Sequence, residues 1–333
     1  MPRLPAWVFL VSATACTNGG PADADTDRPG DTEVPDDTDL PDDTDPPVVD
    51  PETVPLAGPC PLDQALGGFS VVSDDLLSVV AGAVADGVVP LTVLDEVATE
   101  GDCTLLRRVA PFCDPPCAAD ETCGLDSECA PYPTQQDVGT VTVEGLLEPV
   151  SMEPSDPGNN YYALGLPHPP YEPGALITLH ADGAFFPAFE LYGVGLVPLE
   201  LVPGEWVLDE GNPLEVRWAA PGATVRSTVH LRVTIDQHGT SPLQLDCDFA
   251  DTGSGTVRAS LVDAFVASGV TGFPSATLTR RTVDSLSLAE GCVELGVEWS
   301  GPGDLRVEDY TPCTEQADCP PDEICNTALE ICE

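Results

Sequence analysis

Lysine is absent from this 333-residue chain, and its only fixed positive charges are eleven arginines. Against them stand 57 aspartates and glutamates, which give a net charge of −46. Without lysine the chain has no Schiff-base nucleophile and no Walker-type phosphate loop. Because Lys and Arg supply most of the affinity for nucleic acid, a chain this acidic would be repelled by it. The composition therefore predicts no nucleic-acid partner.

Long apolar runs are also missing. The longest at the N-terminus covers residues 4–11 and follows Arg3, which is too short for a helix that spans about 30 Å of hydrocarbon. It predicts a secretory signal over residues 1–15. Ala15 and Cys16 at its end resemble the lipobox of bacterial lipoproteins, although Ala13 stands where leucine is usual.

That resemblance implies that the signal is cut before Cys16 and that a diacylglycerol is attached to its thiol. The membrane would then be contacted through the N-terminal lipid. Thr17, rather than aspartate, after the cysteine favours the outer membrane, on the periplasmic or the surface face. The alternative is a plain export signal that leaves Cys16 as a free thiol.

A stalk is predicted over residues 16–56. Its residues 17–55 hold eleven Asp, two Glu and one Arg among Pro, Thr and Gly, so they cannot bury enough apolar surface to offset the entropy of ordering. We expect a disordered acidic linker. Calcium binding by Asp23, Asp25 and Asp27 is the alternative, but the spacing lacks the Gly and the Glu of an EF-hand loop. We therefore expect no metal site here.

The thirteen cysteines form an odd number, which is unusual for an exported protein. Removing Cys16 as the lipidated residue leaves twelve disulfide candidates in even groups. We expect one pair each from Cys60 with Cys103 and from Cys247 with Cys292. Two four-cysteine clusters, whose internal connectivity the spacing leaves open, consist of Cys113, Cys117, Cys123 and Cys129, and of Cys313, Cys319, Cys325 and Cys332.

Short runs of alternating apolar and polar residues predict a mainly β fold: an antiparallel β-sandwich with small disulfide-rich modules and a disordered N-terminal linker. The expected parts are a small β-rich region at 57–108, a Cys-rich module at 109–133, the sandwich at 137–309 and a C-terminal Cys-rich module at 310–333.

Two helices are expected in these parts. One short helix is expected around Leu94 to Ala98. A second, in "ASLVDAFVASG", would place Leu261, Val262, Phe265 and Val266 on one face.

Neither Cys cluster has the close C-x2-C arms or histidine partners of a zinc site. The second cluster resembles the Cys-rich repeat similar to the Dickkopf N-terminal cysteine-rich domain, through Cys313, Asp318, Cys319, Cys325 and Cys332. With the lipobox, the Asp/Thr/Pro stalk and the β-rich body, the layout resembles surface lipoproteins of predatory, high-GC bacteria that have no established activity. The resemblance implies location and architecture, not chemistry.

One stretch resembles an enzyme motif: "ADTGSGTV", residues 250–257, is similar to the Asp-Thr-Gly-Ser loop of aspartic proteases. That mechanism needs two carboxylates that share one proton, and no second D-T-G occurs in the chain. The four histidines have no spaced metal or triad partners, and no G-x-S-x-G elbow is present. We expect no catalytic residues and no cofactor.

A binding loop is predicted in "NNYYALGLPHPPYEPG", where Tyr161, Tyr162, His168 and Tyr171 lie among prolines. Aromatic rings on a stiff loop suit protein or glycan ligands. The alternative is that two of the tyrosines cover the edge of the sandwich. The sequence thus predicts a lipid-anchored envelope protein that displays a β-sandwich for binding or structural roles. The alternatives are a dimeric aspartic-type hydrolase that uses Asp251 and a secreted module that resembles protease inhibitors.

Overall fold

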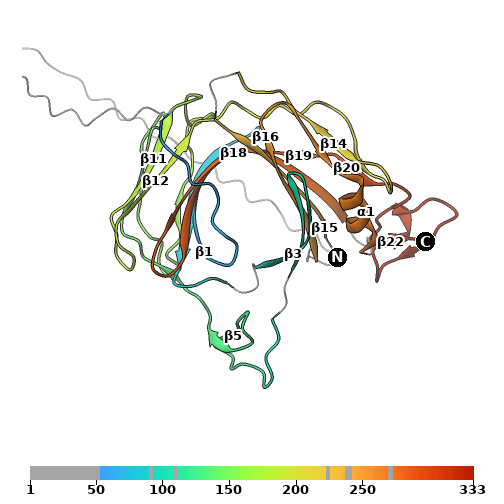
Figure 1. Cartoon of the computed structure of the whole chain (residues 1–333), viewed down its shortest axis with the longest axis horizontal. Helices are drawn as coiled ribbons and strands as arrows, with labels where there is room; N and C mark the ends of the chain where they lie inside the picture. The colour runs from blue at the N-terminus through green and yellow to red at the C-terminus, as the bar shows by residue number, and fades with distance from the viewer. Residues whose placement is uncertain (1–52, 90–92, 109–110, 223–225, 237–241, 269–272) are drawn as a thin grey trace, which may run out of the picture. The chain divides into compact units, whose positions relative to one another are not determined.

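The computed structural model describes residues 53–89, 93–108, 111–222, 226–236, 242–268 and 273–333 (Figure 1). The expected signal, Cys16 and all but the last four residues of the expected stalk lie outside the described residues. One compact unit contains all of the described residues. Among them, no helix has the length and apolar character needed to cross a bilayer.

A ten-stranded sheet is the centre of the fold, with the strand order β10-β2-β1-β19-β18-β15-β16-β4-β3 and with β7 paired to β2. Its strands are β1 (Ala65–Ser73), β2 (Ser78–Ala85), β3 (Leu94–Glu100), β4 (Cys103–Arg108), β7 (Gln135–Gln136), β10 (Tyr161–Ala163), β15 (Thr228–Asp236), β16 (Leu243–Ala250), β18 (Phe273–Ser287) and β19 (Cys292–Gly303).

The first four strands in the described part of the chain belong to this sheet, so the expectation of a separate β-rich region at 57–108 is wrong. β1 pairs in parallel with β19, far along the chain, and β4 pairs with β16. The expected helix at Leu94 to Ala98 is also wrong, because these residues form the edge strand β3. β3 pairs with β4 and has a bulge between Glu96 and Ala98, and backbone pairing along β4 overrides the weak local signal for a helix.

A second layer covers the apolar face of the large sheet. Its four strands, in the order β12-β11-β8-β9, are β8 (Val141–Glu144), β9 (Val150–Met152), β11 (Leu176–Ala181) and β12 (Phe189–Val194), and β12 contacts β18 and β19. Two strand pairs complete the layer: β13 (Trp206–Leu208) with β20 (Leu305–Val307), and β14 (Leu214–Arg217) with β17 (Ser254–Val257). Figure 1 shows the large sheet as an arc, with β11 and β12 outside it at one end and β14 outside it at the other.

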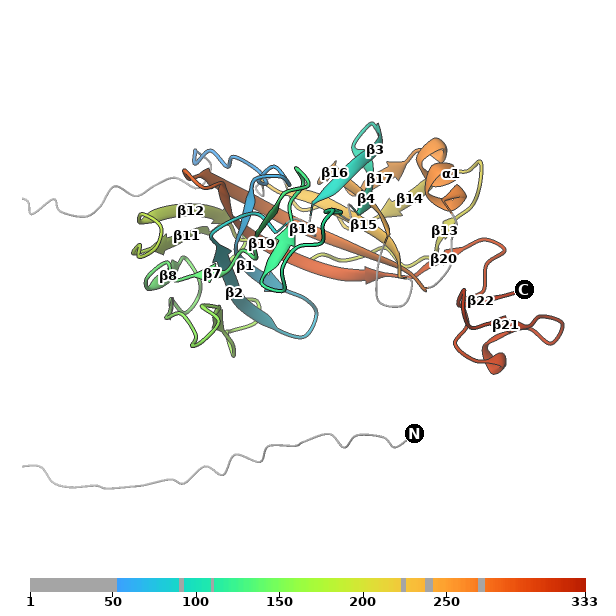
Figure 2. The ribbon, with the colours of Figure 1, turned by 90° about the horizontal axis from the view of Figure 1, so that it is seen from below.

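The helix α1 (Ala259–Ala267) confirms the expectation for "ASLVDAFVASG". Leu261, Val262 and Phe265 are buried in the core and Val266 is half-buried, as their shared helix face requires. α1 contacts β3 and β4 (Figure 2). Two packed β layers with one short helix confirm the predicted mainly β sandwich.

Six disulfides join the twelve cysteines of the compact unit, but the two long-range bridges exchange the expected partners. Cys60 is bonded to Cys292, and Cys103 is bonded to Cys247. The expected Cys60–Cys103 and Cys247–Cys292 pairs are wrong because β4 lies directly beside β16, with Cys103 opposite Cys247. The parallel pairing of β1 with β19 likewise brings the chain before β1 to Cys292.

The two Cys-rich modules share one connectivity, first to third and second to fourth cysteine. The bridges are Cys113–Cys123 and Cys117–Cys129 in one module and Cys313–Cys325 and Cys319–Cys332 in the other. Each module contains a two-stranded hairpin: β5 (Glu121–Cys123) with β6 (Cys129–Pro131), and β21 (Cys325–Asn326) with β22 (Ile331–Cys332). Covalent bridges replace a hydrophobic core in pieces of this size.

Replacing one cysteine of a long-range bridge tests the exchanged pairing. We expect Cys60→Ala to release a thiol at Cys292, which alkylation of the unfolded chain and peptide mapping would locate. Loss of this bridge, which spans 232 residues, should lower the free energy of unfolding by about 2–5 kcal/mol. Cys103→Ala is the matched control and should release Cys247. A thiol found at Cys103 in the Cys60→Ala variant would contradict the pairing.

Candidate functional site

The large sheet has one face in the core and one polar face. Along β15, the side chains of Val229, Leu231 and Val233 are fully buried in the core, and the residues between them point the other way. We call this other side the polar face. On β15, β16, β18 and β19 its ionisable members are His230, Arg232, Asp236, Asp246, Asp248, Arg281, Glu294 and Glu298.

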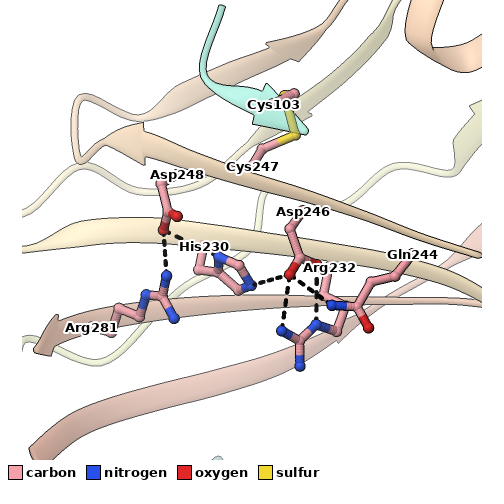
Figure 3. Close-up of polar contacts among 8 residues, drawn as sticks. All are labelled: Cys103, His230, Arg232, Gln244, Asp246, Cys247, Asp248 and Arg281. Atoms are coloured by element: carbon pink, nitrogen blue, oxygen red, sulfur yellow. Dashed lines mark hydrogen bonds and ion pairs between the residues drawn. A yellow bond between two sulfur atoms is a disulfide. The ribbon is translucent and has the colours of Figure 1, made fainter. Parts of the chain in front are cut away.

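A continuous ionic network links three strands of the polar face (Figure 3). His230 lies between two carboxylates, with Nδ1 3.1 Å from Asp248 Oδ1 and Nε2 3.8 Å from Asp246 Oδ2. Arg281 Nη2 is 2.5 Å from the same oxygen of Asp248. Arg232 binds Asp246 in a bidentate pair, through Nε at 3.1 Å and Nη2 at 3.0 Å.

Strand register places these groups together. His230 is directly opposite Asp248, and Arg232 is directly opposite Asp246, across the pair β15–β16. Cys247, between the two aspartates, points to the opposite face and bonds Cys103 on β4 (Figure 3). The disulfide therefore holds the strand that carries both carboxylates.

Burial and charge act in opposite directions on the carboxyl groups of the polar face. Burial alone would raise the pKa of Asp248, but the hydrogen bond with His230 and the positive charges of Arg281 and His230 outweigh it and lower that pKa to about 2. For Glu298, burial is the largest effect and raises the pKa above its usual value, with Glu294 acting in the same direction. Glu298 is thus a half-buried carboxyl group whose charge is poorly compensated.

Two cavities adjoin the network and share Arg281. One, of about 310 Å³, is lined by Ser70, Glu294, Gly296 and Glu298 from the centre of the sheet. The other, of about 460 Å³, lies towards β15 and is lined by Thr228 and Asp248, among others. Pro59 and Val283 contribute to both cavities. Hollows beside half-buried ionisable groups are the usual form of a small-ligand site.

The structure separates the four residues of the predicted binding loop. Tyr161 and Tyr171 are buried in the core, at 1% and 2% exposure. His168 accepts or donates a hydrogen bond at Nδ1 with Ser78 Oγ, 2.8 Å away. His168 is exposed, and Tyr162 is the one tyrosine among the four residues that presents its ring to solvent, at 59% exposure; Tyr162 lies directly opposite Ala81, which lines the 310 Å³ cavity. The loop thus supplies one aromatic residue to this side of the sheet.

Asp251, the residue of the protease-like motif, is a buried partner of Arg280. The Arg280 Nε atom is 2.7 Å from Asp251 Oδ2, and both side chains are almost fully buried. The other donors to this carboxylate are Trp218 Nε1 at 2.7 Å, Ser227 Oγ at 2.6 Å and Arg280 Nη2 at 3.1 Å. Because its two oxygens accept four hydrogen bonds, Asp251 is held in a structural role.

The cysteine clusters offer no thiolate to a metal. The two groups of three sulfurs that lie close together belong to disulfide-bonded cysteines of the Cys-rich modules. Zinc needs the deprotonated thiol, so these sulfurs cannot serve as its ligands while they are oxidised.

The polar-face network was not predicted from the sequence. Its signal was present in the stretches "HLRVTID" and "LQLDCDFA", where charged residues alternate with apolar ones. The alternation of charged and apolar residues predicts that the charged side chains point away from the core, but it does not predict which strands are neighbours. The pairing of β15 with β16 and β18 was needed to bring the charges together.

Comparisons with known proteins identify no family. No protein-family model matches the chain, and no curated protein does. Among solved structures, the chain is similar to the FN1–FN3 domains of chicken CNTN1, at 5% identity and a TM-score of 0.17, over 67% of this chain and 71% of that one. It is also similar to a Ca²⁺-stabilized adhesin that helps an Antarctic bacterium reach out and bind ice, at 13% identity and a TM-score of 0.17.

The match to the adhesin covers 75% of this chain and spans about half (51%) of that protein. Both TM-scores are too low to carry an argument about this protein.

Substituting Asp251 should destabilise the fold. Asp251→Asn leaves the charge of Arg280 buried without a counter-charge, which costs about 3–5 kcal/mol in free energy of unfolding. Urea titration measures the loss, and Asp304→Asn, at an exposed position, is the control and should change it by less than about 0.5 kcal/mol. A loss below about 1 kcal/mol for Asp251→Asn would contradict the structural role.

The ion pairs of Asp248 should make stability depend on pH. Its pKa is lowered in the folded state to about 2, so its contribution is present above the unfolded value of about 3.9 and is lost as the pH falls towards 2. Because this side chain is 50% exposed, we expect only about 1 kcal/mol at neutral pH. The free energies of unfolding of the native protein and of Asp248→Asn should therefore converge in acid. A difference that stays undiminished as the pH falls through about 2 would rule out this linkage.

Proposed function

We propose that this protein is anchored to the cell envelope by a lipid on Cys16 and binds a ligand on the polar face of its large sheet. The polar-face network carries the proposal. It keeps His230, Arg281 and Glu298 half-buried or buried beside cavities of about 310 and 460 Å³. Burying ionisable groups is costly, and a sandwich with a purely structural role would gain stability from uncharged residues there.

The anchoring rests on the lipobox-like residues before Cys16 and on the count of cysteines. All twelve other cysteines form disulfides within the described residues, which leaves Cys16 as the one cysteine without a partner among them. An acidic body would be repelled by anionic headgroups, so the lipid would supply the membrane contact. The acidic linker would then separate the body from the membrane, and we propose the outer membrane as its location.

Binding, rather than catalysis, is the proposed role of the polar face. The protease-like Asp251 is committed to Arg280 in the core, and the polar-face groups pair with one another instead of activating a serine or a cysteine nucleophile. The ligand would be a protein or another polar molecule that contacts the sheet from the side of Tyr162.

Site-specific photo-crosslinking tests the binding face. Tyr162 replaced by p-azidophenylalanine keeps an aromatic ring at the cavity side of β10, and we expect it to form covalent adducts in the producing cells. The matched control replaces Phe185, which is 55% exposed and lies outside the polar face between β11 and β12. Adducts at both positions, or at neither, would argue against a binding face.

Metabolic labelling tests the anchor. Cells grown with a labelled fatty acid should incorporate it into the native chain and lose the incorporation in Cys16→Ala. The compact unit should fold equally in both chains, because Cys16 belongs to none of its disulfides. Unlabelled native protein would disprove the lipid anchor without affecting the proposed binding face.

A further inference from the structure

The carboxyl group of Glu298 on the polar face has a raised pKa because burial outweighs the attraction of Arg281, His230 and Arg232. Arg281 lies directly opposite Glu298 on the neighbouring strand, but its guanidinium group pairs with Asp248 instead. Glu298 makes no hydrogen bond or ion pair with any residue that the structure describes. Burial raises its pKa, which means that the surroundings disfavour its negative charge. A positively charged ligand would remove this penalty.

His230 is a buried polar group of this face whose Nε2 faces Asp246 Oδ2 at 3.8 Å, beyond hydrogen-bond distance. It is 7% exposed, and within the described part of the chain its Nε2 has no hydrogen-bond partner. One buried and one half-buried polar group of this face, His230 and Glu298, therefore keep hydrogen-bonding atoms that are unused among the described residues.

Gly296 opens the space in front of Glu298. A Cβ atom at this position would lie 2.8 Å from Oε1 of Glu298, so the carboxyl group folds back over the glycine towards Glu294. Glu294 stands four residues away on the same strand and face, about 13 Å along an extended chain. The backbone N–H of Cys60 donates to Glu294 Oε2 at 2.9 Å and holds this second carboxylate at the cavity.

The charge balance of the cavity is negative. Its ionisable lining groups are Glu294, Glu298 and Arg281, and Asp248 already neutralises Arg281. Ser70 on β1, which lies opposite Gly296 of β19, adds a small polar side chain to the cavity lining. Tyr162, opposite Ala81, adds an exposed aromatic ring at this end of the sheet, and such a ring favours cations within about 6 Å of its face.

From these observations we propose that the 310 Å³ cavity binds the guanidinium group of an arginine side chain presented by a basic peptide or protein. A guanidinium group is planar and has five N–H donors, so it can pair with the carboxylate of Glu298 through two parallel hydrogen bonds and still donate to neighbouring oxygens, which a compact ammonium group cannot do in the same geometry. The net charge of −46 would attract a basic partner from solution. The inference rests on the proposed binding face and names the chemistry of its ligand.

Calorimetric titration with N-acetyl tri-arginine amide tests this site. The full chain is purified in detergent and titrated at about 0.15 M salt, where attraction beyond about 8 Å is screened. We expect saturable binding of tri-arginine and none of the neutral, equally shaped tri-citrulline peptide. Equal binding of both peptides would overturn the proposal, because charge would not be recognised.

Gly296→Ala separates the cavity from the general acidity of the protein. It changes no charge, but its methyl group must displace the carboxyl group of Glu298, so we expect binding to weaken about tenfold. Gly301→Ala is the matched control on the same strand, where the added Cβ would make only an ordinary contact of 3.5 Å. Equal affinities in the native, Gly296→Ala and Gly301→Ala proteins would show non-specific attraction and would overturn the proposal.

Glu298→Gln supplies a second variant with an independent readout. It keeps the shape and removes the uncompensated charge, so we expect affinity to fall about ten- to a hundredfold while thermal stability stays the same or rises. A merely structural glutamate would lose stability instead, and that result would count against the site.

The tri-arginine titration and the crosslinking at Tyr162 together distinguish failure of the arginine site from failure of the binding face. If tri-arginine does not bind and adducts still form at Tyr162, the binding face stands and the arginine ligand is wrong. If tri-arginine does not bind and no adducts form, both proposals fail.

Discussion

The buried ion pair between Arg280 and Asp251 is the constraint on which the two-layer structure depends. All five N–H donors of Arg280 are used: two bind Asp251, and three bind the backbone carbonyls of Val197, Pro198 and Ala219. One side chain of β18 thereby fastens the segments that follow β12 and β14 to the large sheet. Because a buried charge without a partner is strongly destabilising, these connections must be in place whenever the sheet is folded.

Strand β18 carries two neighbouring arginines with different surroundings. Arg280 and Arg281 are adjacent in β18, so they point to opposite faces: one is enclosed in the core, and the other lies at the cavities of the polar face. A shift of β18 by one residue would turn Arg280 to the polar face, away from Asp251. The core pair therefore fixes the register that presents Arg281 beside Asp248 and opposite Glu298.

Local patterns in the sequence predicted what depends on local physics. Alternation predicted the strands, and the spacing of Leu261, Val262 and Phe265 predicted α1, because each follows from the burial of one face. The disulfide partners of Cys60 and Cys103 depend on which strands meet after separations of 232 and 144 residues, and no local pattern encodes that. The polar-face network and the partner of Asp251 could not be predicted for the same reason, since their members come together only through pairing of distant strands.

The parallel pairing of β1 with β19 forms part of the 310 Å³ cavity and lies next to the segment that follows the proposed linker. This pairing places Ser70 opposite Gly296. The Cys60–Cys292 disulfide joins the segment before β1 to the first residue of β19. The chain before β1 runs along β18, where the Gly58 N–H donates to the Val283 carbonyl, and Pro59 lines both cavities. A ligand in the 310 Å³ cavity would thus contact the segment through which the proposed linker joins the body. Tension on that linker would act first on the hydrogen bonds of Ala57 and Gly58 with β18, and the Cys60–Cys292 disulfide behind them would hold the start of β19, the strand that carries Glu294 and Glu298.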